Sequence, residues 1–321
     1  MNLYNLHTNP EKLDSYERRL KVPSLAYEYG RKNGFTDELI SAITMDARWA
    51  HGYATDVLNF TPWHKAPDID PKIARKAEET IAADTKWAYM YAMNSLGKSW
   101  HESDVDPKIA RQAELNIVKD AELAYQYARF VIKKPWHETD VDPDIARQAE
   151  EMIVKNAKWA VEYAKEVLRK RWHKAPGIDP DLARQAQETI ATKPRRAYEY
   201  AKDVLRRTPW HKAPGIDPDL ARQAEQNISK DALSATGYAH FVLKKTPWHE
   251  YPGIDPKIAR QAQETIAADA WAAYQYARYV LKEPWHKYPG IDPNLARQAE
   301  QAIAEYPGWA DQYEKSFGIK L

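Results

Sequence analysis

The chain has no cysteine among its 321 residues, which excludes a disulfide framework, a thiolate metal site and a cysteine nucleophile. Apolar runs are short, and none approaches the ~20 residues that a bilayer-spanning helix needs. Together with the 29% of charged residues, this predicts a soluble protein. The first residues lack the basic segment and apolar core of a secretory signal, so we expect no such signal. An excess of one charge is missing too, because 47 Lys and Arg face 46 Asp and Glu. That balance leaves no global field to hold a nucleic acid or a charged membrane.

Phenylalanine is scarce, with 5 residues against 12 Trp and 20 Tyr. The positions of the tryptophans reveal a tandem repeat, because the dipeptide Trp-His recurs seven times at intervals of 36 to 38 residues. Self-similarity at such a period is the signature of stacked helical units. The seven tryptophans are Trp63, Trp100, Trp136, Trp172, Trp210, Trp248 and Trp285.

The first half of each repeat predicts a helix. An aspartate followed by proline, as in Asp70-Pro71, is the pattern of a capping side chain and of proline at the first helical position. Apolar residues such as Ile73, Ala77 and Ile81 follow four apart and predict one narrow buried stripe.

The second half predicts another helix. It begins at an acidic or amide residue such as Asp84 and ends in basic residues, which suits the helix dipole. One tyrosine recurs between alanines, and we expect it to pack between successive hairpins with its hydroxyl on a backbone or carboxylate partner. The column holds Tyr29, Tyr53, Tyr91, Tyr127, Tyr163, Tyr200, Tyr238, Tyr276 and Tyr313.

The array continues beyond the Trp-His markers at both ends. Asn9-Pro10 and Thr36 have the pattern of helix caps, Asp46 starts a second helix, and Glu314 replaces an alanine where a terminal hairpin needs a polar face. We therefore predict an all-α solenoid of about nine tandem helix-turn-helix hairpins. Its parts are two short N-terminal capping hairpins over 1–62, six repeats of 36–38 residues over 63–284, and a final repeat with a C-terminal cap over 285–321.

The stretch from Ala113 to Trp136 reads A-E-x-x-I-x-x-D-x-x-x-A-Y-x-Y-A-x-x-V-I-K-x-x-W. This phrase resembles a tandem repeat found in proteins of tailed bacteriophages and some bacteria. The extra segment after each Trp, which includes His173-Lys174-Ala175-Pro176, departs from that pattern. The resemblance implies a cytoplasmic or virion-associated protein in a bacterial or phage-infected cell, and it implies little chemistry.

The histidine after each tryptophan invites a metal assignment. Equivalent atoms of stacked hairpins lie ~10 Å apart, whereas two histidines on one zinc must each come within ~2.1 Å of it. We therefore expect these histidines to cap carbonyls at a helix end or to bond a nearby Asp, with no metal and no cofactor. Glycine-rich phosphate loops and nucleophile motifs are missing, and we expect no enzyme.

An arginine also recurs in each first helix, with Glu or Gln three residues later. Five of these seven pairs, such as Arg75 with Glu78, are predicted to form ion pairs on the helix surface. The alternative is that this arginine ladder, with exposed tryptophans, binds a nucleic acid. The ladder is Arg75, Arg111, Arg147, Arg184, Arg222, Arg260 and Arg297.

Charge is uneven locally, because eight basic side chains face five acidic ones between Trp172 and Pro209. Variable columns beside invariant ones are where a repeat protein usually carries its ligand surface. We expect a non-catalytic protein-binding or structural scaffold whose partner is another protein, a virion component or a host factor, with nucleic acid as the alternative and no membrane. The candidate partner surface consists of Trp87, Trp159, Arg195, Arg196, Lys202 and Arg206.

Overall fold

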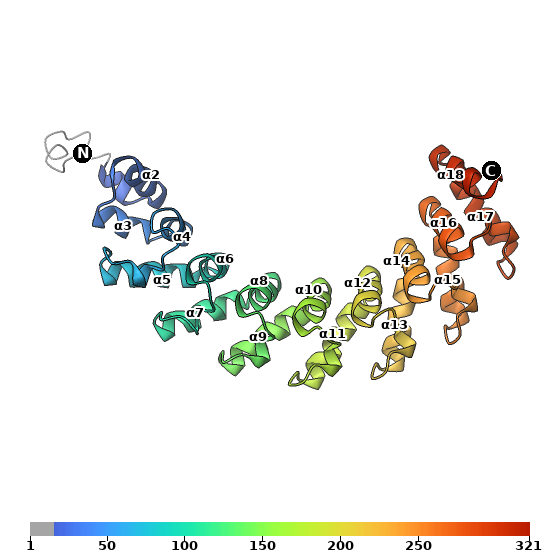
Figure 1. Ribbon diagram of the computed structural model, residues 1–321, viewed down its shortest axis with the longest axis horizontal. Coiled ribbons are helices and arrows are strands. Elements are labelled where there is room, and N and C mark those ends of the chain that lie inside the picture. Colours follow the sequence, from blue (N-terminus) through green and yellow to red (C-terminus); the bar gives the residue numbers. More distant parts are fainter. Residues whose placement is uncertain (1–15) are drawn as a thin grey trace. The chain divides into compact units, whose positions relative to one another are not determined.

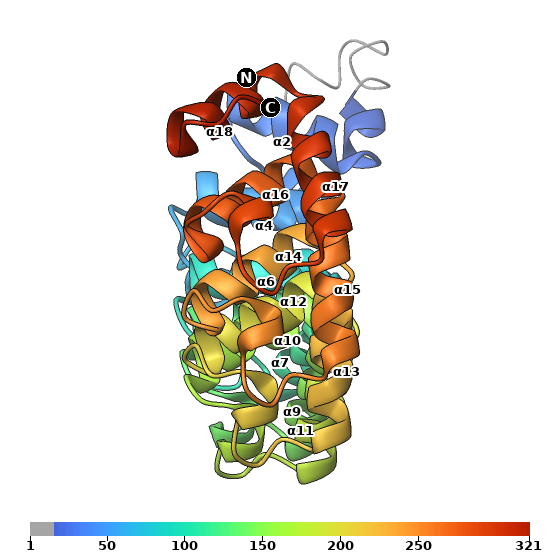
Figure 2. The ribbon, with the colours of Figure 1, turned by 90° about the vertical axis from the view of Figure 1, so that its right-hand side faces the viewer.

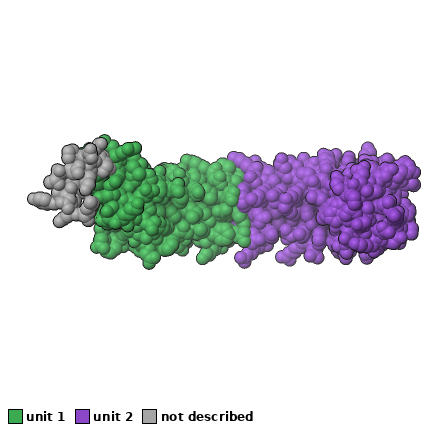
Figure 3. Space-filling view, turned by 90° about the horizontal axis from the view of Figure 1, so that it is seen from above, with its two compact units in different colours: residues 1–153 green, residues 154–321 purple. Residues whose placement is uncertain are grey.

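The computed structural model describes residues 16–321. The chain divides into two compact units, of which the first ends at Ile153 and the second begins at Val154 (Figure 3). Helices and loops alone make up the described residues, in which there is no β-strand, and the predicted all-α fold is confirmed. None of the helices between residues 16 and 321 is both long enough and apolar enough to cross a bilayer. The helix cap predicted at Asn9-Pro10 lies outside the described residues.

Helices of two kinds alternate along each unit (Figure 1). Unit 1 contains α2 (Pro23–Asn33), α3 (Asp37–Ile43), α4 (Ala47–Asp56), α5 (Pro71–Ala83), α6 (Thr85–Tyr91), α7 (Pro107–Ile117), α8 (Ala121–Gln126) and α9 (Pro143–Val154), whose last residue begins unit 2. Unit 2 continues with α10 (Ala157–Glu162), α11 (Pro180–Ala191), α12 (Pro194–Glu199), α13 (Pro218–Ile228), α14 (Ala232–Gly237), α15 (Pro256–Ala267), α16 (Ala270–Tyr276), α17 (Pro293–Ala304) and α18 (Pro307–Phe317). Odd-numbered helices are the first helices of hairpins, and even-numbered ones are the second helices.

Within each unit, helices of the same kind pack on one another. In unit 2, α11 packs on α13, and α15 packs on α17, while α12, α14 and α16 form a second row. Figure 2 shows these two layers, with α13, α15 and α17 on one side and α12, α14 and α16 on the other. Each hairpin thus buries its apolar faces against its neighbours, as stacked repeats do.

The predicted caps are present. The side chain of Asp70 accepts a hydrogen bond from the Lys72 N–H, and that of Thr36 accepts one from Leu39. Asp46 caps α4. These side chains satisfy backbone donors that the first turn of a helix leaves unpaired.

The sequence predicted second helices that are α-helical throughout, and this is wrong for six of them. From α6 to α16, each second helix changes to a π-helical segment at or after the repeated tyrosine, with hydrogen bonds such as the 2.9 Å bond from Leu205 N–H to Tyr200 O. One extra residue per turn has no signature in apolar spacing, which explains why the prediction missed it. The π segments are η3 (Ala92–Leu96), η4 (Tyr127–Ile132), η6 (Tyr163–Leu168), η8 (Tyr200–Val204), η10 (Tyr238–Val242) and η12 (Ala277–Leu281).

The aromatic columns form the core. Trp210 is fully buried, its indole N–H donates to Ala197 O over 3.0 Å, and its ring lies 5.3 Å from that of Tyr200 in the preceding repeat. Eight of the nine column tyrosines, from Tyr53 to Tyr313, are buried. Tyr29, in α2, is half-buried. The Trp and Tyr excess is therefore mostly internal packing, and each such ring buries roughly 150–250 Å².

Candidate functional site

A hydrogen-bond network joins the two helices of each repeat. In one copy the Tyr238 hydroxyl donates to Glu225 Oε1 over 2.8 Å and accepts the Trp210 N–H over 3.1 Å. The Nδ1 atom of His211 lies 2.7 Å from the same glutamate oxygen. Burial, with the nearby Glu225, raises the pKa of Tyr238 well above its ordinary value. The histidine thus bonds an acidic side chain as predicted, although that acid is a glutamate and not an aspartate. Equivalent pairs are His64–Glu78, His101–Glu114, His137–Glu150 and His286–Glu300.

In two repeats, glutamine replaces this glutamate. Gln187 Nε2 lies 2.7 Å from His173 Nδ1, so the amide donates and the ring carries its proton on Nε2. That second nitrogen lies 3.1 Å from Pro214 O, to which it donates. Burial lowers the pKa of His173, and the nearby Arg171 and Lys174 lower it further. This histidine is therefore a neutral structural link between neighbouring repeats.

The histidine ladder does not assemble a metal centre in the part of the chain that the structure describes. No group of three or more His, Asp or Glu side chains there could hold one ion. Each Nδ1 atom instead lies within 2.6–2.7 Å of the Glu or Gln on its own first helix.

The predicted ion pairs between each arginine and the glutamate three residues later are wrong. Glu78 is 2% exposed, and it faces inward to bond His64. Arg75 pairs with Glu79 at 3.1 Å and with Asp106 of the next repeat at 3.1 Å. The ladder is therefore largely neutralised by its own surface carboxylates. Other pairs are Arg111–Asp142, Arg147–Glu151, Arg184–Glu188, Arg222–Asp255 and Arg260–Glu264.

The two tryptophans of the candidate partner surface are half-buried. Trp87, in unit 1, lies 5.2 Å from the ring of His51 and has the Lys86 ammonium 5.0 Å from its centroid. Trp159, in unit 2, has Lys158 at 3.8 Å. Each ring thus already carries a lysine of its own helix over it, in a cation–π arrangement.

The basic residues of that surface lie at two ends of one helical segment. Arg195 and Arg196 begin α12, and both pair with Glu199, at 2.9 and 2.5 Å. Lys202 lies in η8, and Arg206 follows its C-terminal end, so these two residues are toward the other end of the segment. Arg195, Arg196 and Arg206 line two separate hollows. The hollow beside Arg195 has a volume of about 430 Å³, and its other lining residues are Lys155, Asn156, Ala157, Lys158, Lys193, Pro194, Arg196 and Asp231.

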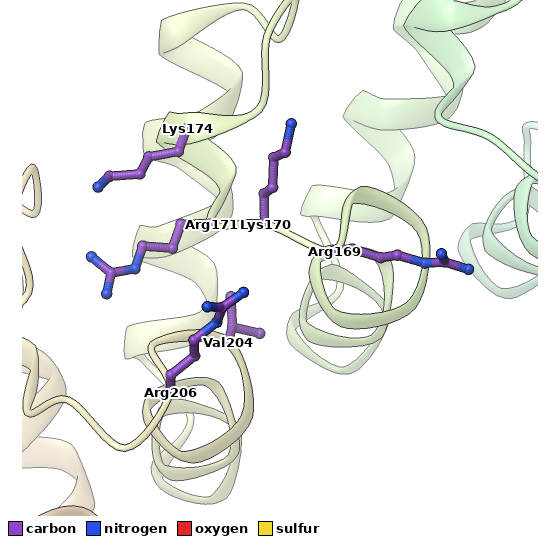
Figure 4. A pocket seen from close by; sticks show the side chains of 6 residues that line it. All are labelled: Arg169, Lys170, Arg171, Lys174, Val204 and Arg206. Carbon is purple, nitrogen blue, oxygen red and sulfur yellow. The ribbon is translucent and has the colours of Figure 1, made fainter.

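The second hollow is a cavity of about 400 Å³ that we call the basic pocket (Figure 4). Its lining residues are Arg169, Lys170, Arg171, Lys174, Val204 and Arg206, five cations and no acid. The pocket lies at the C-terminal ends of η6 and η8. Those two ends supply roughly −0.5 charge each, which offsets only about one of the five cations.

The cations of the basic pocket have no acidic partner within residues 16–321. The ion pair of Lys165 with Asp203, at 3.8 Å, does not include any of them. The Nη1 atom of Arg171 is buried and makes no hydrogen bond in the described structure. A buried neutral donor without a hydrogen-bond partner destabilises the folded state by roughly 1–3 kcal/mol, and a charged donor destabilises it by more. Such a group marks a place where a ligand would satisfy the arginine.

Sequence reasoning named Arg206 and missed the rest of the basic pocket. A signal was present at Arg171, because the residue before Trp is proline in five of the seven copies and arginine only here. The proline copies are Pro62, Pro135, Pro209, Pro247 and Pro284.

The positive charge continues along unit 2 on residues that we call the basic ridge: Arg169, Arg206, Arg207, Lys244, Lys245 and Lys282. Each is exposed and has a left-handed φ between 52° and 65°. None of them has an ion pair in the part of unit 2 that the structure describes. The two units differ in the charge of the segment that runs from each repeated tyrosine to the residue after the next Trp-His pair. In unit 2 these segments contain 14 basic and four acidic residues, and in unit 1 they contain five basic and three acidic residues.

Exposed rings precede the ridge cations on two second helices of unit 2. Phe241 is 40% exposed and Tyr279 is 37% exposed. The Lys202 ammonium lies 5.2 Å from the Phe241 centroid, and the Arg278 guanidinium lies 5.2 Å from that of Tyr279. Because η8, η10 and η12 pack in succession, these rings and the ridge cations that follow them lie on neighbouring second helices of unit 2.

Comparison with known proteins adds little to this geometry. No protein-family model matches the chain, and no curated protein matches it. One solved structure, titled as the crystal structure of an engineered protein, is 16% identical and covers 88% of this chain and 77% of its own, with a TM-score of 0.27. A superposition of that quality carries no argument about function.

Proposed function

We propose that this protein is a non-catalytic binding scaffold that holds single-stranded nucleic acid along the basic ridge of unit 2. The observation that carries the proposal is that consecutive second helices of unit 2 carry both unpaired cations and exposed rings toward their C-terminal ends. Proteins that bind single strands combine a basic groove for the phosphates with aromatic faces on which bases stack. Phe241 and Tyr279 offer such faces, and Lys244 and Lys245 follow Phe241 by three and four residues.

The regular array supports this use. Helical repeats present equivalent side chains at regular steps, and in some repeat proteins each step reads one base. In unit 2 each second helix from α10 to α16 is followed by one or two ridge cations, such as Arg206 and Arg207 in one repeat and Lys244 and Lys245 in the next. A strand laid along these helix ends meets a cation at every repeat.

A protein partner was the first expectation from the sequence, and the contacts favour nucleic acid over it. Arg195 and Arg196 already share Glu199, so part of the surface assigned to a protein partner is neutralised. The arginine ladder assigned to nucleic acid is also neutralised, and the basic ridge takes its place in the proposal. Residence in a phage or bacterial cell stays a prediction of the sequence resemblance.

The proposal is tested by fluorescence anisotropy with three probes of equal length: a single-stranded oligonucleotide, the same sequence as a duplex, and an acidic peptide. We expect the single strand to bind most tightly. Phe241→Leu keeps an apolar side chain and removes the stacking face, and it should weaken single-strand binding by roughly 1–3 kcal/mol, the usual value of one stacked base.

The matched control is Trp271→Leu, which removes an exposed ring from the first turn of α16, at the opposite end of that second helix from the ridge residue Lys282. It should leave binding unchanged, because no ridge cation lies at that end of the helix. Tighter binding of the acidic peptide than of the single strand would overturn the proposal in favour of a protein partner. Equal losses in the two variants would remove the basic ridge as the binding surface.

A further inference from the structure

The basic pocket is more concentrated in charge than the ridge that continues from it. Five cations line about 400 Å³, which is within the usual size range of small-molecule sites. They come from three places in the chain: Arg169 and Lys170 follow η6, Arg171 and Lys174 flank Trp172 and His173, and Arg206 follows η8.

Figure 4 shows which of these side chains can act together. Arg171 and Lys174 extend to the same side, and Arg206 lies next to Arg171, with Val204 beside it. Arg169 extends in the opposite direction, and Lys170 lies between the two sides. Arg171, Lys174 and Arg206 therefore form the centre of the basic pocket.

We propose that the basic pocket binds a phosphate group with two negative charges, which a terminal phosphate carries and an internal phosphodiester does not. A phosphate monoester has a charge of about −1.5 to −2 and three strong acceptor oxygens. Guanidinium groups match those oxygens with paired N–H donors, and Lys174 adds a third cation as a point charge.

Arg171 is the residue that sets this pocket apart from the rest of the array. Its backbone, with φ −66° and ψ 143°, suits the proline that five other copies have at this position. The fold therefore does not require arginine here. The buried Nη1 atom has no partner in the described structure, and a phosphate oxygen in the pocket would accept its hydrogen bond.

Two sources could supply such a phosphate: a free phosphate compound or the phosphorylated end of a nucleic acid strand. The phosphate site depends on the proposed binding of single strands only if the phosphate belongs to a strand end. Binding to the basic pocket and binding to the basic ridge are separable, because Lys244 and Lys245 line only the ridge.

The test uses isothermal titration calorimetry of the full chain with inorganic pyrophosphate. We expect one site, and at least tenfold weaker binding in Arg171→Pro, which installs the residue of the other copies. Arg206→Asn should weaken binding similarly, because asparagine tolerates the left-handed φ of 54° at that position. Lys257→Gln removes an exposed cation from the start of α15 and should leave pyrophosphate binding unchanged.

A second arm compares an oligonucleotide with a 5′-phosphate and the same strand with a 5′-hydroxyl. Tighter binding of the phosphorylated strand, lost in Arg171→Pro, supports a strand end as the source. Pyrophosphate binding without that preference supports a free phosphate compound. The proposal would be overturned if the parent chain did not bind pyrophosphate, or if a folded Arg171→Pro variant bound it as tightly as the parent. If Lys244→Asn/Lys245→Asn loses strand binding and keeps pyrophosphate binding, the loss is assigned to the basic ridge and the basic pocket is supported as a separate site.

Discussion

The ring of His173 occupies the space that a side chain on Gly215 would need: a β-carbon there would lie 2.9 Å from the ring Nε2. The same nitrogen donates to Pro214 O over 3.1 Å, so the histidine of one repeat holds the loop of the next. Gly215 also has a φ of +83°, which side chains rarely adopt. Conformation and space therefore both require glycine at this turn.

Gly215→Ala should lower the free energy of unfolding by roughly 2–3 kcal/mol, because left-handed strain costs ~1–2 kcal/mol and the ring of His173 must move as well. Urea denaturation followed by circular dichroism measures the change. Gly52→Ala is the control, because Gly52 lies within helix α4 and a β-carbon at this position would meet no atom within 4 Å. It should be neutral or stabilising by up to ~1 kcal/mol. Equal losses in the two variants would refute this role of His173.

The tyrosine network gives a second prediction. Tyr238→Phe leaves the buried Glu225 without one donor and the Trp210 N–H without its acceptor. We expect a loss of about 2–3 kcal/mol in the free energy of unfolding, the usual consequence of unmet buried polar groups.

Tyr276→Phe is the matched comparison. Its hydroxyl accepts the Trp248 N–H over 3.2 Å, but its repeat has Gln263 in place of the glutamate. No buried carboxylate loses a donor there, so the expected loss is smaller, about 1 kcal/mol. The network account would be wrong if the two variants lost the same stability.

The glutamine repeats predict a pH effect. Burial lowers the pKa of His249 below its ordinary value of 6.5, and the charge of Glu250, 3.6 Å from the ring Nε2, offsets only part of that effect. Gln263, 2.6 Å away, supplies a donor and no charge. The unfolded chain then binds the proton more readily than the folded one. This contribution to stability is present above pH 6.5 and is lost as the pH falls below it.

Gln263→Glu places a carboxylate beside His249 and should raise the pKa of that histidine. The thermal midpoint of the variant should therefore fall less than that of the parent between pH 7 and pH 5.5. Circular dichroism at both pH values checks this difference, and a steeper fall in the variant would contradict the assignment.

Local rules predicted the parts of the fold that depend on neighbours in sequence. Asp70 before proline and Thr36 before an acidic turn were identified as caps because a cap is decided within three residues. The buried role of Tyr91 followed from its invariant alanine neighbours. Glu78 was misassigned, because an i,i+3 rule cannot tell which side of the helix lies against the loop that carries His64.

The candidate site was harder to predict. Arg206 was identified from local charge, but Arg195 and Arg196 were grouped with it although they lie at the other end of the same segment. The basic pocket needs the ends of η6 and η8 to meet, which spacing along the chain does not report. Arg171 was visible as a departure from the repeat, and only its buried, unpartnered nitrogen shows why that departure matters.

The central claim is tested most directly by the salt dependence of single-strand binding. Each phosphate contact contributes about −0.7 to the slope of log affinity against log salt concentration. Lys244→Asn/Lys245→Asn should therefore make the slope shallower by roughly 1.4 relative to the parent, because it removes two phosphate contacts. Arg184→Gln/Arg260→Gln removes two ion-paired ladder charges and should leave the slope unchanged. A slope that responds to the ladder variant and not to the ridge variant would contradict the account.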